Sequence, residues 1–248
     1  MSAEPKIVVS DLHKSFASRQ GALPVIGGVS FDVADGEFVA IVGPSGCGKS
    51  TLMNVIAGFE RPDSGEVRID GQAVHGPSPK GIVISQHGSV FPWLTVHENL
   101  MFGLSGTRHG DKKGRADRYI DMVGLAGFEA AYPHELSGGM LKRVEIARAL
   151  VVKPEILYMD EPFSALDALM SLKMQIEFRR ILDEERHTVL LITHDVEEAI
   201  YMADRILVLS ARPTTIQATF AVDLPHPRRL SSPQAQALRE AILKELGL

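Results

Sequence analysis

Residues 38–51 have the sequence FVAIVGPSGCGKST, and this stretch decides the fold. Its first five residues, 38–42, are all apolar, which predicts a strand buried on both faces inside a sheet. A glycine-rich loop follows at once. Residues 49–57 then have helical spacing, and Gly58 follows them as the residue that most easily adopts the conformation of a helix end. We therefore expect a central strand, a tight loop and a helix in direct succession.

The loop, GPSGCGKS at 43–50, matches the phosphate-binding pattern of nucleotide-binding proteins. Its glycines let successive backbone N–H groups converge on phosphate oxygens, and the following helix adds the partial positive charge of its N-terminus. Lys49 would reach the β and γ phosphates, and the Ser50 hydroxyl would bind Mg²⁺. The alternative is a chance glycine-rich turn, but the strand before the loop and the helix after it favour a nucleotide site.

A second strand pattern ends in two carboxylates. Residues 156–159 are apolar, and Asp160 and Glu161 follow directly. Ligands of parallel sheets bind at the carboxyl ends of the strands, which is where these acids are expected. Asp160 suits Mg²⁺, and Glu161 suits a general base that activates the attacking water. Without a phosphate loop upstream, the same pair would be an ordinary acidic turn.

The sequence LSGGM at 136–140 opens a third segment of interest. Ser137 lies where the N-cap of a helix belongs, and helical spacing continues over 144–150. Ser-Gly-Gly at a helix N-terminus offers a second site for an anion. A single subunit needs two such sites only if the second one binds a phosphate held by another subunit. A plain capped helix start is the alternative.

The other patterns indicate an α/β fold. Residues 6–16 and 29–33 alternate apolar and polar side chains, as strands with one face in water do. Further strand patterns occupy these stretches: 66–69, 156–159, 189–193 and 206–209. Helical spacing marks these: 116–123, 144–150, 169–185 and 196–203. Alternating strands and helices imply a mostly parallel sheet. Ser232 and Pro233 are typical of a helix start, and the apolar face of the helix that they open is expected to pack on the domain.

Composition narrows the class of protein. A formal net charge of -5 without a basic stripe or tail argues against a nucleic-acid binder. The single cysteine, Cys47, excludes an internal disulfide framework and suits a reducing compartment. The first residues lack the pattern of an export signal, and no stretch approaches 18 consecutive apolar residues. We therefore expect a chain that reaches a membrane only through a partner.

These segments occur in the order and with the spacing of the ATP-binding-cassette (ABC) transporter ATPases, and the chain resembles that family over essentially its whole length. The resemblance assigns the family's motifs in this order: the Walker A loop at 43–50, the Q-loop at Gln86, the signature at 137–140, the end of Walker B at Asp160 and Glu161, the D-loop at 164–167 and the switch histidine at His194.

The family's architecture implies one ABC ATPase domain over 1–248. Its core would be a P-loop NTPase of the RecA-like type with a mostly parallel sheet and an N-terminal antiparallel β subdomain, over 1–86 and 153–220. An inserted α-helical subdomain over 87–152 would carry the signature. Residues 221–248 would form a C-terminal tail with a helix.

The resemblance also implies the site residues. ATP would contact Phe16, Gly43, Pro44, Ser45, Gly46, Cys47, Gly48, Lys49, Ser50, Thr51, Ser137, Gly138 and Gly139. Catalysis would depend on Glu161, His194, Lys49 and Gln86, and Mg²⁺ would bind Ser50, Gln86 and Asp160. Phe16 falls where the family places an aromatic ring against adenine. Family members dimerise head to tail around two ATP molecules, so Ser137 and Gly139 would contact the γ-phosphate bound to the other subunit of a homodimer or pseudo-dimer.

Three features resemble the nitrate, sulfonate and taurine importer group: FPWLTV at 91–96, Met140 in place of Gln, and DLPHPRR at 223–229. This group implies permease subunits docked near Phe91–Leu94, a periplasmic or extracellular solute-binding protein acting indirectly, and a cytoplasmic position on the inner face of the cell membrane. The apolar cluster around the only tryptophan, Trp93, suits such docking. Packing inside the helical subdomain is the alternative.

Other functions stay open. The same cassette serves exporters and lipid-trafficking systems, and the sequence does not separate these from importers. DNA-repair and chromosome-organising ATPases usually insert long coiled coils between Walker A and the signature, and no sustained heptads lie between Lys49 and Ser137. A catalytically silent assembly subunit is disfavoured because both Lys49 and Glu161 are present.

The chain also departs from the family's pattern. Met140, Leu141 and Lys142 stand where many members have glutamines, and Ser85 precedes Gln86 where phenylalanine is usual. None of these changes removes a group expected to touch phosphate. We therefore expect ATPase activity, and the departures leave coupling to a partner as the open question.

Overall fold

The computed structural model describes residues 4–19, 21–86, 88–106 and 111–248. These residues form two compact units, one made of residues 1–81 and 187–248 and the other of residues 82–186. We call them unit 1 and unit 2. His87, where the helical subdomain is expected to begin, lies outside the described residues. The subdomain boundaries expected from the sequence stay a prediction.

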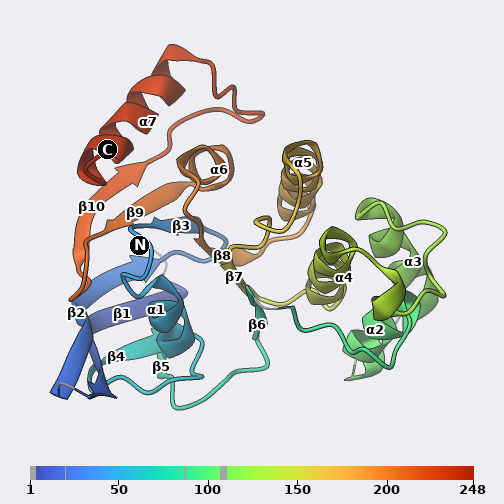
Figure 1. Cartoon of the computed structure of the whole chain (residues 1–248), viewed down its shortest axis with the longest axis horizontal. Helices are drawn as coiled ribbons and strands as arrows, with labels where there is room; N and C mark the ends of the chain where they lie inside the picture. Colours follow the sequence, from blue (N-terminus) through green and yellow to red (C-terminus); the bar gives the residue numbers. More distant parts are fainter. Residues whose placement is uncertain (1–3, 20, 87, 107–110) are drawn as a thin grey trace. The chain divides into compact units, whose positions relative to one another are not determined.

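Unit 1 contains the central strands in the order β10-β9-β3-β8 (Figure 1). Their bounds are β3 Phe38–Val42, β8 Thr188–Ile192, β9 Arg205–Leu209 and β10 Ile216–Ala221. Strand β3 runs parallel to β8 and β9, and β10 is antiparallel to β9. Every residue of β3 and of β8 is buried, because neighbouring strands flank them and both faces are covered. The expected central strand is thereby confirmed.

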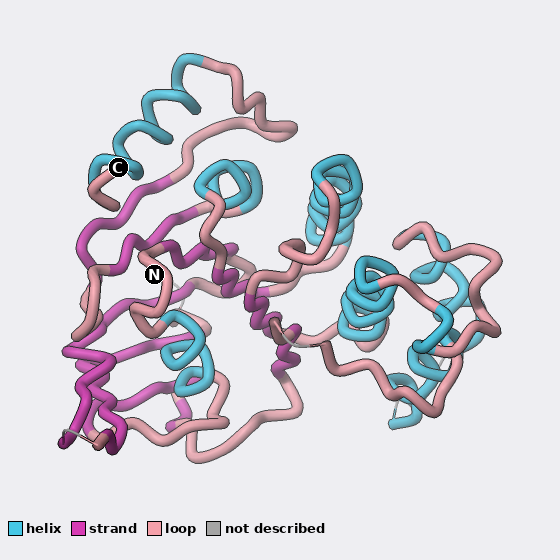
Figure 2. The backbone as a smooth tube through the Cα atoms, in the orientation of Figure 1, coloured by secondary structure: helices cyan, strands magenta, loops and turns pink. Residues whose placement is uncertain are grey.

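A second, antiparallel sheet of unit 1 has the order β2-β1-β4-β5, and its strands appear in magenta in Figure 2. The strands are β1 Ile7–Ser18, β2 Gly21–Val33, β4 Ser64–Ile69 and β5 Gln72–Ala73. Ile7, Val9 and Leu12 of β1 are buried, and more exposed residues lie between them. The alternating pattern therefore correctly predicted a sheet with one covered face.

Helices complete unit 1. They are α1 Lys49–Ile56, α6 Val196–Met202 and α7 Pro233–Glu245. The Ser232 hydroxyl accepts a hydrogen bond from the Ala235 N–H at 3.3 Å, and Pro233 occupies the first helical position, as the sequence indicates. Ala235 and Ile242 are buried where α7 packs on α6 and β10. The C-terminal helix thus packs on β10, the strand at the edge of this sheet.

The tail is held by one arginine. The Arg228 side chain is 2% exposed and lies 3.8 Å from Asp204. Its guanidinium donates to five backbone carbonyls: Ile200 at 2.9 Å, Tyr201 at 3.3 Å, Ala203, Val222 at 3.2 Å and Leu224 at 3.2 Å. Three of these carbonyls lie at the end of α6, where a helix leaves its last carbonyls without partners. Arg228 therefore joins the end of α6 to the tail.

In unit 2 the described residues form two strands and four α-helices. They are β6 Gly81–Ile84, β7 Ile156–Asp160, α2 Val96–Gly103, α3 Lys112–Met122, α4 Gly138–Leu150 and α5 Ala168–Glu184, with short 3-10 turns at Leu104–Gly106 and Pro133–Glu135. Leu100, Ile120 and Val144 form a buried core between α2, α3 and α4. The helices expected between Gln86 and β7 are therefore present.

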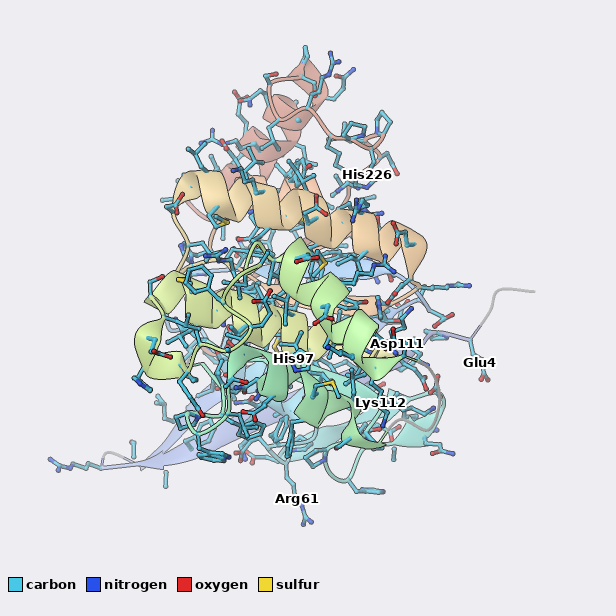
Figure 3. All side chains as sticks on the ribbon, turned by 90° about the vertical axis from the view of Figure 1, so that its right-hand side faces the viewer. Glu4, Arg61, His97, Asp111, Lys112 and His226 are labelled. Atoms are coloured by element: carbon cyan, nitrogen blue, oxygen red, sulfur yellow. The ribbon has the colours of Figure 1, made fainter. Side chains whose placement is uncertain are left out.

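Figure 3 turns the green helices α2 to α4 toward the viewer. His97 of α2, labelled there, lies 3.6 Å from the carboxylate of Asp117 on α3. Asp111, also labelled, caps α3 by accepting from the Gly114 N–H at 2.9 Å. In the described ranges, no helix has both the length and the apolar content that crossing a bilayer requires.

Candidate functional site

The phosphate loop joins the buried end of β3 to the first turn of α1. Gly46 and Gly48 have φ angles of 70° and 121°, which side chains other than glycine rarely allow. A Cβ on Gly48 would lie 2.6 Å from Cγ1 of Val25, so a larger residue would displace this part of the loop. The loop therefore requires glycine at both position 46 and position 48.

Lys49 lies across this loop. Its ammonium donates to the carbonyl oxygens of Gly43 at 2.8 Å and Pro44 at 3.0 Å, and its side chain is buried. A buried ammonium needs such acceptors, and these two are carbonyls of the loop itself. The cation is therefore held at the place where the sequence pattern puts a phosphate.

A hydrogen bond from Thr214, a residue far away in the sequence, stabilises the loop. Cys47 is buried, its N–H donates to the Pro44 carbonyl at 3.2 Å, and its own carbonyl accepts from the hydroxyl of Thr214. Thr214 is fully buried, and its backbone N–H donates to the Val25 carbonyl at 2.8 Å. The sequence contained no signal for Thr214, because only the fold brings it beneath the loop.

His194 lies at the same sheet edge as the phosphate loop. In the parallel pair of β3 and β8, Ile41 is opposite Ile192, and the Thr193 N–H donates to the Ile41 carbonyl at 3.2 Å. The Thr193 hydroxyl donates to buried Glu198 at 2.7 Å and accepts from the Asp195 N–H at 3.0 Å. The backbone on both sides of His194 is therefore anchored.

Phe16 lies on the hairpin of β1 and β2, opposite Leu23. Its ring is partly exposed, and the ammonium of Lys14 lies 5.1 Å from the ring centre. A partly exposed ring can stack on a flat ligand, whereas a core phenylalanine would be covered.

In unit 2 the structure brings Gln86 and Glu161 together. Gln86 follows β6 and Glu161 follows β7, and these strands are neighbours. The Gln86 amide donates to a carboxylate oxygen of Glu161 at 3.2 Å. The sequence predicted both residues as catalytic but not this contact between them.

The backbone at Glu161 is held in an unusual conformation. Its φ is 47°, a left-handed value that costs a non-glycine residue on the order of 1–3 kcal/mol. The Glu161 carbonyl accepts from both the N–H and the hydroxyl of Ser164, at 3.3 Å and 2.9 Å. Ser164 therefore fixes the sharp turn that follows Asp160 at the end of β7.

The signature segment opens α4 as expected. The Ser137 hydroxyl caps the helix by accepting from the Met140 N–H at 3.3 Å. A Cβ on Gly139 would lie 3.4 Å from Leu166 of the D-loop, in ordinary contact. A Cβ on Gly138 would have nothing within 4 Å among the described atoms. This helix start is therefore open to a group from outside the chain.

The fold, the loop at 43–50 in unit 1 and the residues after β6 and β7 in unit 2 define a P-loop nucleotide hydrolase. The family model described as "ABC transporter" matches residues 26–164. The chain belongs to the ABC transporter family and is an ATPase of its ATP-binding-cassette type.

Two relatives and a solved structure support this family assignment. The nitrate import ATP-binding protein of Synechocystis sp. is 44% identical over 88% of this chain and 82% of the relative. An aliphatic sulfonates import ATP-binding protein of Bacillus cereus is 40% identical over 96% of this chain and 95% of the relative. A dimeric ATP-binding cassette in a post-hydrolysis state, bound to ADP and Pi, superposes with a TM-score of 0.77 and 29% identity, covering 87% of this chain and 98% of that one.

Proposed function

We propose that this ATPase energises a membrane importer for small solutes such as nitrate, sulfonates or taurine. The observation that carries the proposal is an exposed aromatic patch directly after Gln86, on a chain whose relatives include nitrate and sulfonate import ATP-binding proteins. The chain would then work at the inner face of the cell membrane, attached through permease subunits. A solute-binding protein on the far side would act on it only indirectly.

ATP would bind unit 1 through its phosphates. The loop of residues 43–48 and the first turn of α1, including Ser50 and Thr51, would surround the phosphate chain with N–H groups. Lys49 would exchange the two loop carbonyls for oxygens of the β and γ phosphates, a stronger charged contact. Phe16 would stack on the adenine.

The chemistry of the three expected metal ligands suits Mg²⁺. Ser50 offers a hydroxyl, Gln86 an amide oxygen and Asp160 a carboxylate, and hard oxygen donors are what Mg²⁺ prefers. Across residues 4–19, 21–86, 88–106 and 111–248, no group of three or more His, Cys, Asp or Glu side chains could hold a metal alone. That suits an ion that completes its shell with phosphate oxygens and water. When bound, Mg²⁺ would neutralise charge on the β and γ phosphates.

Hydrolysis would depend on Glu161 as general base. Its carboxylate would accept a proton from water as the water oxygen attacks the γ-phosphorus and the bond from that phosphorus to the β-phosphate oxygen breaks, so that ADP leaves with that oxygen. The Gln86 amide would hold the carboxylate in place. Lys49 and His194 would stabilise the charge that develops on the γ-phosphate.

The open helix start at Ser137, Gly138 and Gly139 would complete the site of a second copy. A head-to-tail homodimer places this anion site against the γ-phosphate bound to the partner. The open space beside Gly138 supports this arrangement, since no described side chain occupies it. Nucleotide would favour the closed dimer because only that form makes these phosphate contacts.

The aromatic patch consists of Phe91, Trp93 and Phe102. The ring of Phe91 lies 5.5 Å from that of Trp93 and 4.6 Å from that of Phe102. Trp93 is 69% exposed and Phe102 is 56% exposed, so the alternative that Trp93 packs inside the helical subdomain is wrong. Aromatic side chains clustered at the surface are typical of a protein interface.

The patch is presented by a rigid loop. Asn99 of α2 is fully buried, and its side-chain amide donates to the carbonyls of Phe91, Leu94 and Thr95 at 3.2, 3.0 and 2.9 Å. Its carbonyl oxygen accepts from the Phe91 N–H at 2.9 Å. A loop held by four hydrogen bonds loses little conformational entropy on binding a partner. We propose a cytoplasmic segment of the permease as that partner.

Trp93→Ala is expected to leave the thermal midpoint of the isolated subunit nearly unchanged, because the indole is mostly in water. Its affinity for the permease should fall by about 2 kcal/mol or more, the effect of losing an interface hot spot. The measurements are a thermal melt of the subunit and co-purification with the permease.

Phe59→Ala is the matched control, since Phe59 is another exposed aromatic residue, 59% exposed, on unit 1. It should leave permease binding intact. Equal retention of the permease by both variants would contradict the docking assignment, and so would a large drop in the midpoint of Trp93→Ala.

Direction and solute are tested by reconstitution. The subunit, its permease and its solute-binding protein are placed in proteoliposomes with ATP on the side of the ATPase. Uptake of labelled nitrate, an alkanesulfonate or taurine toward that side, dependent on the binding protein, is the expected result. Transport away from the ATPase would establish an exporter and contradict the proposal.

A further inference from the structure

Helix α4 carries a buried ion pair that nucleotide binding does not explain. Lys142 and Glu145 are 3.0 Å apart, and their side chains are 4% and 2% exposed. Removing two charges from water costs several kcal/mol, and well-packed apolar residues of similar size are often as stable or more so. A stabilising role alone therefore does not account for the pair.

The pair contacts the segment that contains Gln86. The Lys142 ammonium donates to the backbone carbonyl of Ser85, the residue directly before Gln86. The other oxygen of Glu145 accepts from the hydroxyl of Ser89 at 2.9 Å. Both ends of the short segment 85–89 are thus attached to α4.

The same contacts continue to the aromatic patch. Arg148, one turn further along α4, donates to the Ser89 hydroxyl at 2.6 Å. Its guanidinium also lies 4.7 Å from the centre of the Phe91 ring. A continuous set of contacts therefore runs from Ser85, the residue before Gln86, through α4 to Phe91.

We propose that Lys142 and Glu145 are positioning residues that hold Gln86 against Glu161 and tie it, through Ser89 and Arg148, to the aromatic patch. The inference rests on the proposed catalytic role of Gln86 and Glu161. Lys142 supplies a donor that fixes the carbonyl before Gln86, and Glu145 supplies an acceptor that fixes the serine after it. Displacement of the patch would then reach Gln86 through α4.

Two double variants separate positioning from folding. Lys142→Met with Glu145→Leu removes the charges together with the hydrogen bonds, and Lys142→Gln with Glu145→Gln removes the charges but keeps a donor and an acceptor. Both pairs avoid an uncompensated buried charge, so both should retain a thermal midpoint close to that of the original protein. Circular dichroism melts check this.

The rates of ATP hydrolysis should differ. The apolar double variant should lose about tenfold or more in kcat with little change in KM for ATP, because a catalytic group displaced by a fraction of an ångström loses rate rather than substrate affinity. The Gln/Gln variant should stay within about threefold of the original kcat, since its amides can replace both contacts. Equal rates in the two variants would overturn the proposal.

A mutant cycle with Gln86→Ala tests whether the effect passes through Gln86. If the pair acts by positioning it, the apolar double variant should lower kcat no further in a Gln86→Ala background. Additive losses would overturn the positioning role. Wild-type kcat in Gln86→Ala alone would instead overturn the catalytic assignment of Gln86, so the two failures are distinguishable.

Should the apolar variant fail to fold, Ser89→Ala gives an independent test, since Ser89 is exposed and its hydroxyl contacts both Glu145 and Arg148. Its kcat should fall with KM for ATP unchanged and the midpoint retained. A rate equal to that of the original protein would argue against the network.

Discussion

Glu161→Gln is expected to lower ATP turnover by about two orders of magnitude or more while ATP still binds, because the amide cannot accept a proton from the attacking water. The substitution keeps the size of the side chain and an oxygen that can accept from the Gln86 amide, whose present acceptor is the Glu161 carboxylate at 3.2 Å. Steady-state hydrolysis and nucleotide binding are measured on the same preparation.

Glu161→Gln also tests whether ATP causes the subunit to dimerise. With hydrolysis blocked, saturating ATP should hold two copies together, because in the proposed composite site each bound γ-phosphate would contact Ser137 and Gly139 of the other copy. Static light scattering should therefore show a dimer with ATP and less dimer without it. A strict monomer at saturating ATP would argue against the composite site.

Glu155→Gln is the matched control, since Glu155 is exposed and precedes β7 where Glu161 follows it. Its turnover should stay close to that of the original protein, because it lies at the amino end of the strand, away from the expected phosphate site. If Glu161→Gln turned over ATP within a few fold of the original, another group would have to be the general base.

Arg228→Met is expected to lower the free energy of unfolding by about 3–5 kcal/mol, which is typical of breaking a buried charged network from one side. Methionine fills much of the volume but donates no hydrogen bond, so the five carbonyls that the guanidinium satisfies would lose that donor. Chemical denaturation monitored by circular dichroism measures the change.

Arg229→Met, at the exposed neighbouring position, is the control and should change the free energy of unfolding by no more than about 0.5 kcal/mol. Equal stability of the two variants would show that Arg228 is dispensable for the tail.

Much of the fold was predictable because its signals are local. The apolar run at 38–42 and the glycines after it specify a strand and a turn by their own backbone and burial requirements, whatever the rest of the chain does. The alternation in β1 and the start of α7 at Ser232 and Pro233 were likewise correct. Strands β6 and β10 were not predicted, because most of their residues are only partly covered or exposed, which gives little hydrophobic contrast.

The candidate site was predictable as a set of residues but not as a set of contacts. Lys49, Glu161 and His194 follow from motif patterns and from the resemblance. The hydrogen bond between Gln86 and Glu161 joins positions 75 residues apart, and the one from Thr214 to the Cys47 carbonyl joins positions 167 apart. No periodicity in a sequence encodes such pairs.

By itself, the sequence determined the α/β class, the phosphate loop and the acids after β7, since neighbouring residues specify each of these. Only the tertiary structure decided that Trp93 lies in water, that Arg228 is buried among carbonyls and that the Lys142–Glu145 pair is buried against the Gln86 segment. For a single side chain outside a periodic pattern, the neighbouring sequence does not indicate whether it will be covered. Burial depends on segments that meet only when the chain has folded.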